Sequence, residues 1–283
     1  MDNFSKVDRN NTGFSDRLML ILAMFAENEG TLGVSEIADA LDIPRSSVHR
    51  ILSPLVAHGF VERTAQRRYR IGTEMFRIAA RIESRFEILQ VAKPMMESIT
   101  AECGETTVLG LLSRARTRFI LAHKVDPQLP LRFRLELLTN QDLIWGSIGR
   151  AILAWLPPLE IRRALAEAGP SMVTGAAAPT WSELLKENEE VRRRGVAISH
   201  GHRAGPDVIG LSSAFLDAHG HARGAIGVIA PSARMTPDKQ ARVTKLLYSH
   251  ASELSYQLGY LPRSRPMMPG CFDSLSFAEH HPK

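Results

Sequence analysis

Residues 34 to 71, VSEIADALDIPRSSVHRILSPLVAHGFVERTAQRRYRI, decide the fold of the first part of the chain. Their apolar spacing predicts two short helices joined by a turn, followed by two short β-prone runs that flank a polar tip. Ser35 is expected to cap the first helix, and Pro44 is expected to occupy the first position of the second. Two crossed helices followed by a hairpin are typical of a winged helix-turn-helix, a module that binds double-stranded DNA.

The second helix has one apolar stripe and one polar side. Its apolar residues recur at i, i+3, i+4 and i+7, from Val48 to Leu55, which predicts that they are buried together. At about 100° per residue, the other side carries small donors and arginine, the side chains that reach base edges and phosphates in a major groove. The residues expected to contact DNA from this helix are Arg45, Ser46, Ser47, His49 and Arg50.

Pro54 lies inside the same helix and removes a backbone donor. We expect it to bend or break the last turn, residues 55 to 59, without abolishing the groove contact. Gly59 is expected to terminate the helix.

Positive charge is concentrated on this part of the chain. Between Arg45 and Arg81 there are eight arginines and two glutamates, a surplus of six charges, whereas the whole chain has a formal net charge of +5. Such a concentration is typical of a surface that neutralises DNA phosphates. In the hairpin, the expected phosphate contacts are Arg63, Arg67 and Arg68. The alternative is an ordinary solvated charged face on a winged-helix module that binds another protein.

Several motifs in a fixed order resemble the IclR family of bacterial transcriptional regulators. They are SEIADALDIPRSSVHRILSPLVAHGFVER with QRRYRIG, then GSIGRAILAWLPP, VRRRGVAIS and GAIGVIAPSARMT, and the similarity covers roughly residues 16 to 260. The resemblance implies an α+β protein with an N-terminal winged helix-turn-helix domain and a C-terminal GAF-like α/β effector-binding domain, joined by a linker helix. The expected boundaries are a polar tail at 1–15, the DNA-binding domain at 16–71, the linker helix at 72–92, the effector domain at 93–262 and a flexible tail at 263–283.

Beyond residue 93 the pattern alternates between strands and helices. A sheet with helices on its faces is the natural architecture for such a pattern. Strands are expected at 108–113, 118–123, 131–138, 196–199, 209–216 and 225–229, and helices at 149–156, 181–194 and 237–258.

The resemblance also implies a pocket for a small effector between the sheet and the loops that cover one face. In members that bind small oxo-acids, donors come from the turn before the helix resembling GSIGRAILA, from the strand resembling GVAIS and from the last two strands. The corresponding residues here are Ser147, Ile148, Ser199, Gly210, Gly227 and Ile229.

Gly227 and Ile229 stand where such members have hydroxyl groups on the last strand. We therefore expect a roomier and less polar pocket for a larger organic acid, such as an aromatic acid. His200, His202 or Ser212 is expected to anchor its polar end. The alternative is that these residues merely pack or face solvent.

Two His-Gly-His triplets, at 200–202 and 219–221, raise zinc as an alternative, because imidazoles are good zinc ligands. The second triplet lies in a predicted hairpin turn, where polar residues are common. We therefore expect no metal and no other cofactor.

Motifs of common enzyme classes are absent from the sequence: it contains no HExxH, GxGxxG, GxxxxGK[ST] or GxSxG. We expect a protein that is not an enzyme; the alternative is a GAF-like domain that binds or converts a ligand, with DNA binding secondary. The polar start, the lack of an apolar run of ~20 residues and two isolated cysteines favour a cytoplasmic protein. The expected partners are double-stranded DNA with a near-palindromic operator, a small organic acid and further copies of the chain, as a homodimer or homotetramer.

Overall fold

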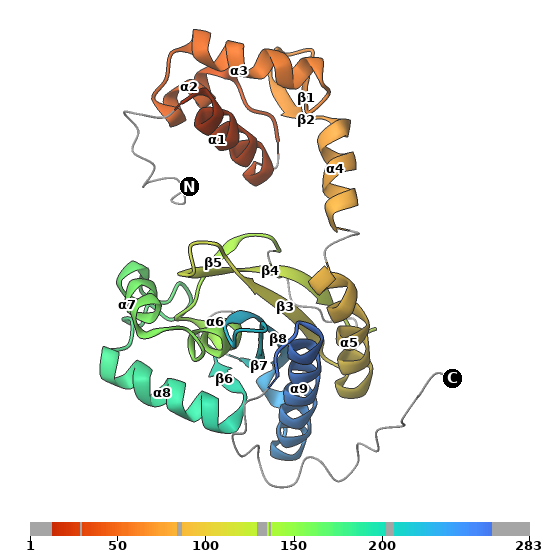
Figure 1. Cartoon of the computed structure of the whole chain (residues 1–283), viewed down its shortest axis with the longest axis vertical. Helices are drawn as coiled ribbons and strands as arrows, with labels where there is room; N and C mark the ends of the chain where they lie inside the picture. The colour runs from red at the N-terminus through yellow and green to blue at the C-terminus, as the bar shows by residue number, and fades with distance from the viewer. Residues whose placement is uncertain are drawn as a thin grey trace. The chain divides into compact units, whose positions relative to one another are not determined.

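The computed structural model describes residues 13–28, 30–83, 87–128, 135, 137–201 and 207–261. The chain forms two compact units, Met1–Lys93 and Pro94–Lys283 (Figure 1). The predicted fold class is confirmed: the first unit has the winged helix-turn-helix arrangement, and the second is an α/β domain. Of the two expected tails, residues 1–12 of the first and all of the second, 263–283, lie outside the described residues.

The first unit contains a three-helix core and a hairpin. Its apolar core forms from the stripe predicted on the second helix, including Val48 and Ile51, together with Ile21, Phe25 and Ile37. Because the apolar residues of each helix repeat at helical spacing, three short helices can bury them in one cluster. The elements are α1 (Phe14–Glu27), α2 (Val34–Leu41), α3 (Arg45–Ala57), β1 (Val61–Arg63), β2 (Tyr69–Ile71) and α4 (Thr73–Glu83).

The helix starts differ from the prediction by about one residue. Ser35 is not the N-cap of α2, since the helix already begins at Val34 and Gly33 precedes it. The Gly33 N–H donates to Glu36 Oε2 at 3.0 Å, so a carboxylate in the first turn satisfies the donor that precedes the helix. Pro44 lies just before α3, with φ −59° and ψ 141°, and not at its first position.

Pro54 does not break α3, which continues to Ala57. The ring lies on the exposed side of the helix, where water can replace the lost hydrogen bond to the Arg50 carbonyl. Gly59, with φ +71°, follows the helix in the left-handed region and supports its predicted termination.

The range expected as one linker helix contains two described helices. The first is α4, and the second is α5 (Glu87–Cys103), which continues into the second unit. Residues 84–86 between them lie outside the described part of the chain.

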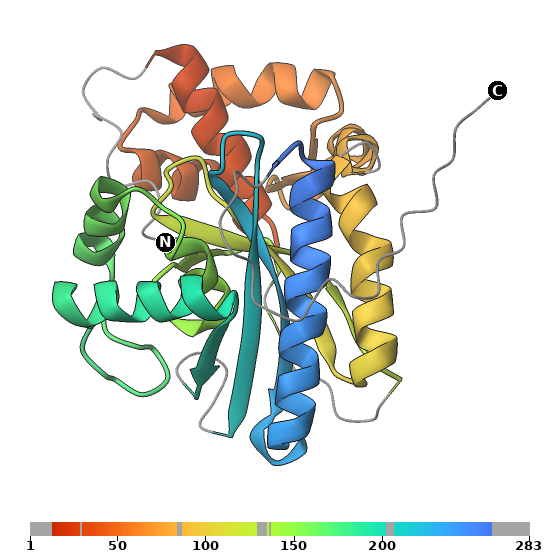
Figure 2. The same cartoon turned by 60° about the horizontal axis from the view of Figure 1, so that its bottom comes forward.

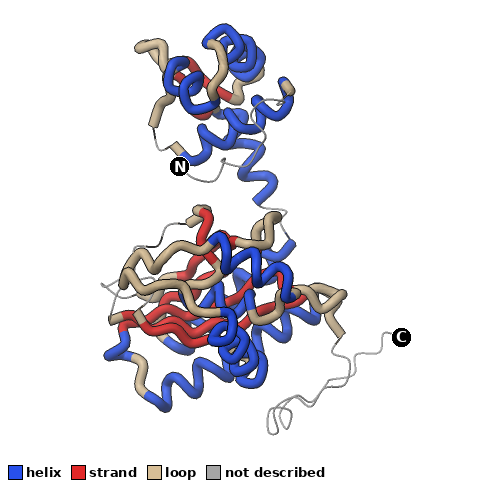
Figure 3. The backbone as a smooth tube through the Cα atoms, turned by 90° about the vertical axis from the view of Figure 1, so that its left-hand side faces the viewer, coloured by secondary structure: helices blue, strands red, loops and turns tan. Residues whose placement is uncertain are grey.

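The second unit is built on a six-stranded antiparallel sheet with the order β5-β4-β3-β8-β7-β6. Helices cover both of its faces, so the strands form a middle layer (Figure 3). Helices α5 and α9 run side by side on one face, and α6 packs on the other face with α7 and α8 beyond it (Figures 1 and 2). The strands are β3 (Thr106–Leu112), β4 (Arg118–Val125), β5 (Asn140–Asp142), β6 (Ala197–His200), β7 (Val208–Leu216) and β8 (Ala222–Pro231), and the helices are α6 (Gly146–Leu153), α7 (Pro158–Glu167), α8 (Trp181–Arg194) and α9 (Pro237–Gln257).

Several elements of this unit differ from the sequence prediction. Helix α6 begins at Gly146, three residues earlier than expected, whereas the helix α7 and the short strand β5 were not anticipated. The strand expected at 131–138 falls mostly on residues outside the description, and its described residues, 135, 137 and 138, are not in a strand. Leu135 and Leu137 instead pack as loop residues against the core, so burial alone explains their apolar alternation.

Candidate DNA-binding surface and effector face

Helix α3 presents its predicted polar side to solvent. Arg45, Ser46, His49 and Arg50 are exposed, and Ser47 is half-buried. The opposite stripe is at most 7% exposed at every position from Val48 to Leu55 that the pattern marked as apolar. A helix with this division can rest on its domain and still place donors in a major groove.

The exposed side chain of Arg50 also makes a cation–π contact with an aromatic ring. Its guanidinium carbon lies 5.9 Å from the centroid of the Phe14 ring, at the start of α1. A cation over a ring face is attracted by the ring quadrupole, and this limits the freedom of the guanidinium before it meets DNA.

The wing between β1 and β2 is a tight, hydrogen-bonded turn. The Thr64 N–H donates to the Arg68 carbonyl at 2.8 Å, and the Arg67 N–H donates to the Thr64 carbonyl at 3.0 Å. Arg67 adopts φ +60°, a left-handed conformation that costs a non-glycine residue about 1 kcal/mol. The turn therefore places the Arg67 side chain, which is exposed, at the tip of the wing.

Arg68 differs from its neighbours because its guanidinium forms hydrogen bonds inside the first unit. It donates to both carboxylate oxygens of Glu36, at 2.9 and 2.8 Å, and to the carbonyl and hydroxyl of Thr31, at 2.6 and 2.7 Å. The hydrogen bonds that Glu36 accepts from Arg68, and then from the Gly33 N–H, lower the pKa of its carboxyl group. Arg68 thus attaches the wing to the start of α2, and its predicted role on DNA stays a prediction.

Other ion pairs reduce the positive charge available on this surface. Arg70 pairs with Glu62 at 3.0 Å, and Arg77 pairs with Glu74. Within the described residues, the arginines of the predicted DNA surface that have no carboxylate partner are Arg45, Arg50, Arg63 and Arg67.

In the second unit, α6 lies against the sheet at five of the predicted effector residues. The Ser212 hydroxyl donates to the Ser147 hydroxyl at 2.7 Å, and this pair is buried. A Cβ on Gly210 would lie 2.6 Å from Ser147 Oγ, and one on Gly227 would lie 2.2 Å from Ser212 Oγ and 3.0 Å from Ile148 Cδ1. The structure therefore brings Ser147, Ile148, Gly210, Ser212 and Gly227 together.

The expectation of a roomier pocket at Gly227 is wrong. The space that a side chain would take is filled by Ser212 and Ile148, because the glycine lets α6 approach the sheet closely. Gly110 on β3 acts in the same way, since its Cβ would lie 2.3 Å from Ile148 Cγ2. Sequence reasoning missed Gly110, although a glycine inside an apolar strand is a signal of close backbone approach.

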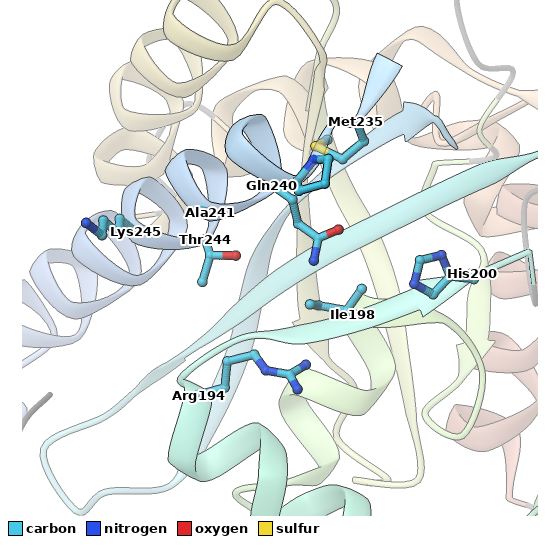
Figure 4. Close-up of a pocket in the computed structure, with 9 residues that line it drawn as sticks. Arg194, Ile198, His200, Met235, Gln240, Ala241, Thr244 and Lys245 are labelled. Carbon is cyan, nitrogen blue, oxygen red and sulfur yellow. The ribbon is translucent and has the colours of Figure 1, made fainter. Parts of the chain in front are cut away.

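The register of the sheet places Ser199 with this group and His200 apart from it. Ser199, Gly210 and Ile229 lie in one row across β6, β7 and β8. Ser199 is 5% exposed, and Ile229 is half-buried. Since side chains alternate along a strand, His200 points to the opposite face, where it lines a groove beside α9 (Figure 4). His202 lies outside the described residues.

The second His-Gly-His triplet lies in the turn between β7 and β8, as predicted. Asp217 Oδ1 accepts hydrogen bonds from the N–H groups of His219 and His221, at 3.0 and 3.1 Å, which accounts for the polar residues of the turn. Within the part of the chain that the structure describes, no group of three or more His, Cys, Asp or Glu side chains is arranged to hold a metal ion.

Two family models match the chain and together span both units. The IclR helix-turn-helix domain matches residues 16–65, and the bacterial transcriptional regulator IclR C-terminal domain matches residues 80–256. The chain belongs to the IclR family. It is a DNA-binding transcriptional regulator with a C-terminal effector-binding domain, as its motifs predicted.

Individual IclR-family proteins agree with this assignment. The chain is 28% identical over 249 residues to the HTH-type transcriptional regulator BhcR of Paracoccus denitrificans, covering 88% of this chain and 87% of that protein. The crystal structure of a putative IclR regulator from Silicibacter superposes with a TM-score of 0.77 at 25% identity, covering 90% of this chain and all of that one. An IclR homologue from Microbacterium hydrocarbonoxydans, solved with 4-hydroxybenzoate, superposes with a TM-score of 0.73 at 19% identity, covering 87% and 99% of the two chains.

Among the helices of the described residues, none is both long and apolar enough to cross a bilayer.

Proposed function

We propose that this IclR-family regulator binds a near-palindromic operator as a homodimer or homotetramer, and that a small organic acid in the second unit changes its affinity for that operator. The observation that carries the DNA part is the exposed polar side of α3, together with arginines that pair with no carboxylate of the described residues. We further propose that the protein acts in the cytoplasm and does not convert its effector.

The proposed roles on DNA follow from where each side chain lies. Ser46, Ser47, His49 and Arg50 would reach base edges, because they lie on the exposed side of α3 and arginine matches the paired acceptors of guanine. The phosphate contacts would come from Arg45, Arg63 and Arg67, with Arg68 holding the wing in position.

The proposed effector site lies where α6 meets the sheet. Ser147, Ser199 and Ser212 would supply hydroxyl groups, and Ile148 and Ile229 would supply apolar surface. Hydroxyl groups beside apolar surface match an organic acid, and the Microbacterium homologue, which was solved with 4-hydroxybenzoate, supports the choice of an aromatic one. The effector can change operator affinity only if it binds the DNA-competent and DNA-incompetent forms unequally.

Fluorescence anisotropy on the DNA upstream of the protein's own gene tests the proposal, with a scrambled duplex as reference and two salt concentrations. We expect specific binding that falls steeply with salt and changes on addition of 4-hydroxybenzoate. Arg50→Ala should weaken operator binding by about 1 to 3 kcal/mol and relax one base position, whereas Arg67→Ala should weaken all DNA similarly.

Two results would contradict these assignments. If Arg50→Ala and Arg67→Ala both reduced binding to the operator and to the scrambled duplex equally, α3 would not be the base-reading element. If pyruvate changed operator affinity and 4-hydroxybenzoate did not, the aromatic effector would be the wrong class.

A further inference from the structure

A groove separate from the α6 face lies on the other side of the sheet. It has a volume of about 840 Å³ and runs between the edge strand β6, the end of α8 and the first turns of α9 (Figure 4). Ile198 and His200 of β6 line it, whereas Ser199, between them in the sequence, faces α6. Ile198 remains half-exposed, so α9 leaves this part of β6 uncovered.

Arg194 enters this groove from the last turn of α8. Figure 4 shows its guanidinium directed toward Ile198 on β6. The helix ends there because Gly195, with φ +75°, follows in the left-handed region and donates its N–H to the Val191 carbonyl.

Arg194 stands out because it is half-buried and has no anionic partner among the described residues. The other half-buried arginines among the described residues of this unit each pair with a carboxylate; they are Arg116 with Glu160, Arg118 with Asp142, Arg150 with Glu187 and Arg234 with Glu105. No carboxylate of the described residues pairs with Arg194. A partly desolvated guanidinium gains more from an anion than a fully exposed one.

Stabilisation of the helix end does not account for this arrangement. The last turn of α8 also contains Arg192, which donates to the Ala154 carbonyl at 2.7 Å, and Arg193, which is exposed. These two cations already complement the negative end of the helix dipole. Nearby, Arg234 and Lys239 both pair with the buried Glu105, whose single negative charge offsets only one of the two positive charges.

The groove combines this cation with polar and apolar groups. Gln240 and Thr244 extend from α9 toward β6, Ile198 and Met235 provide apolar walls, and Lys245 points away from the other labelled side chains (Figure 4). A planar guanidinium that lines one groove together with an amide and a hydroxyl can bind a carboxylate, and the apolar walls match a hydrocarbon body. We propose that this groove is a second binding site, for a small organic carboxylate with an apolar body.

Occupancy of this site also has a structural consequence for β6. The strand carries Ile198 toward the groove and Ser199 toward α6. A ligand in the groove therefore restrains the strand that contributes Ser199 to the opposite face. The proposed groove site can be tested without a ligand at the α6 face and without the operator.

Methyl NMR of the full chain, labelled at isoleucine and methionine, distinguishes the two faces. Ile198 and Met235 report on the groove, and Ile148 and Ile229 report on the α6 face. Benzoate, titrated at constant ionic strength, is expected to shift the Ile198 and Met235 methyls saturably, and benzamide, its uncharged analogue, is expected to bind at least about 10-fold more weakly there.

Matched variants assign the effect to the guanidinium. Arg194→Ala should weaken benzoate binding at the groove by about 10-fold or more, and the neighbouring Arg193→Ala should leave it unchanged. Arg194→Lys should give an intermediate affinity, because it keeps the charge and loses the planar fork.

Three results would overturn the proposal. In the first, benzoate shifts only Ile148 and Ile229, which places the ligand on the α6 face alone. In the second, benzoate and benzamide bind the groove equally or Arg194→Ala has no effect. In the third, the Ile198 and Met235 methyls respond to protein concentration and not to benzoate, which makes the groove a contact between copies of the chain.

Discussion

Replacing Arg67 by glycine separates the charge of the wing from its fold. Arg67 lies at the tip with φ +60°, and no carboxylate of the described residues pairs with it. Glycine adopts this conformation without strain, which recovers about 1 kcal/mol, and the greater freedom of the unfolded chain offsets a similar amount. We expect the free energy of unfolding to change by less than about 1 kcal/mol.

The effect on DNA follows from counterion release. If Arg67 neutralises one phosphate in each protomer, its loss reduces the slope of log K against log salt by about 0.9 per protomer, or about 1.8 for a dimer. Between 50 and 200 mM salt, the fold decrease in DNA affinity should therefore be about 12 times smaller for a dimer of Arg67→Gly than for the unmodified protein. The assay is anisotropy on one duplex over that salt range, with chemical denaturation as the check on folding.

A neutral double variant is the matched control. Glu62→Gln with Arg70→Gln removes an ion pair of the same wing, whose atoms lie 3.0 Å apart, and leaves the net charge unchanged. We expect it to keep the original salt slope. A phosphate contact by Arg67 is refuted if Arg67→Gly keeps the full slope, or if the double variant reduces the slope as much as Arg67→Gly does.

Three further predictions concern stability. Gly72→Ala should destabilise the first unit by about 3 kcal/mol in urea denaturation, because the added Cβ would lie 2.2 Å from the Gly59 carbonyl oxygen. A loss of stability below about 1 kcal/mol would contradict this, since it would mean that the backbone shifts easily there. Ser212→Ala should cost the second unit about 1 to 2 kcal/mol, since the buried Ser147 hydroxyl loses its partner at 2.7 Å, and an unchanged midpoint would argue against that hydrogen bond. Burial holds the pKa of His250 below the ordinary 6.5, so the unfolded state binds the proton first and stability falls as the pH drops below 6.5. His250→Gln should flatten this dependence below pH 6.5 by less than about 1 kcal/mol. A midpoint temperature of unfolding that falls equally with pH in both proteins would contradict it.

Sequence patterns were sufficient to predict the properties that depend on residues close together in the chain. The repeat of Val48, Ile51, Leu52 and Leu55 predicted the buried side of α3, because a helix fixes which residues share a face. The motifs identified the family, and the bounds predicted for α8 agree with the structure because Thr180 and Gly195 are strong local signals for its two ends.

Properties that depend on partners distant in sequence required the tertiary structure. Arg67 and Arg68 are equivalent in the sequence, and only folding brings Glu36 and Thr31 to Arg68 while Arg67 stays at the tip. Likewise, Gly227 looked like empty space because its sequence neighbours do not reveal that Ile148 fills it. Local sequence thus determined the elements and the family. Residues distant in sequence decided which arginines pair with a carboxylate, and which space beside the sheet is filled by side chains.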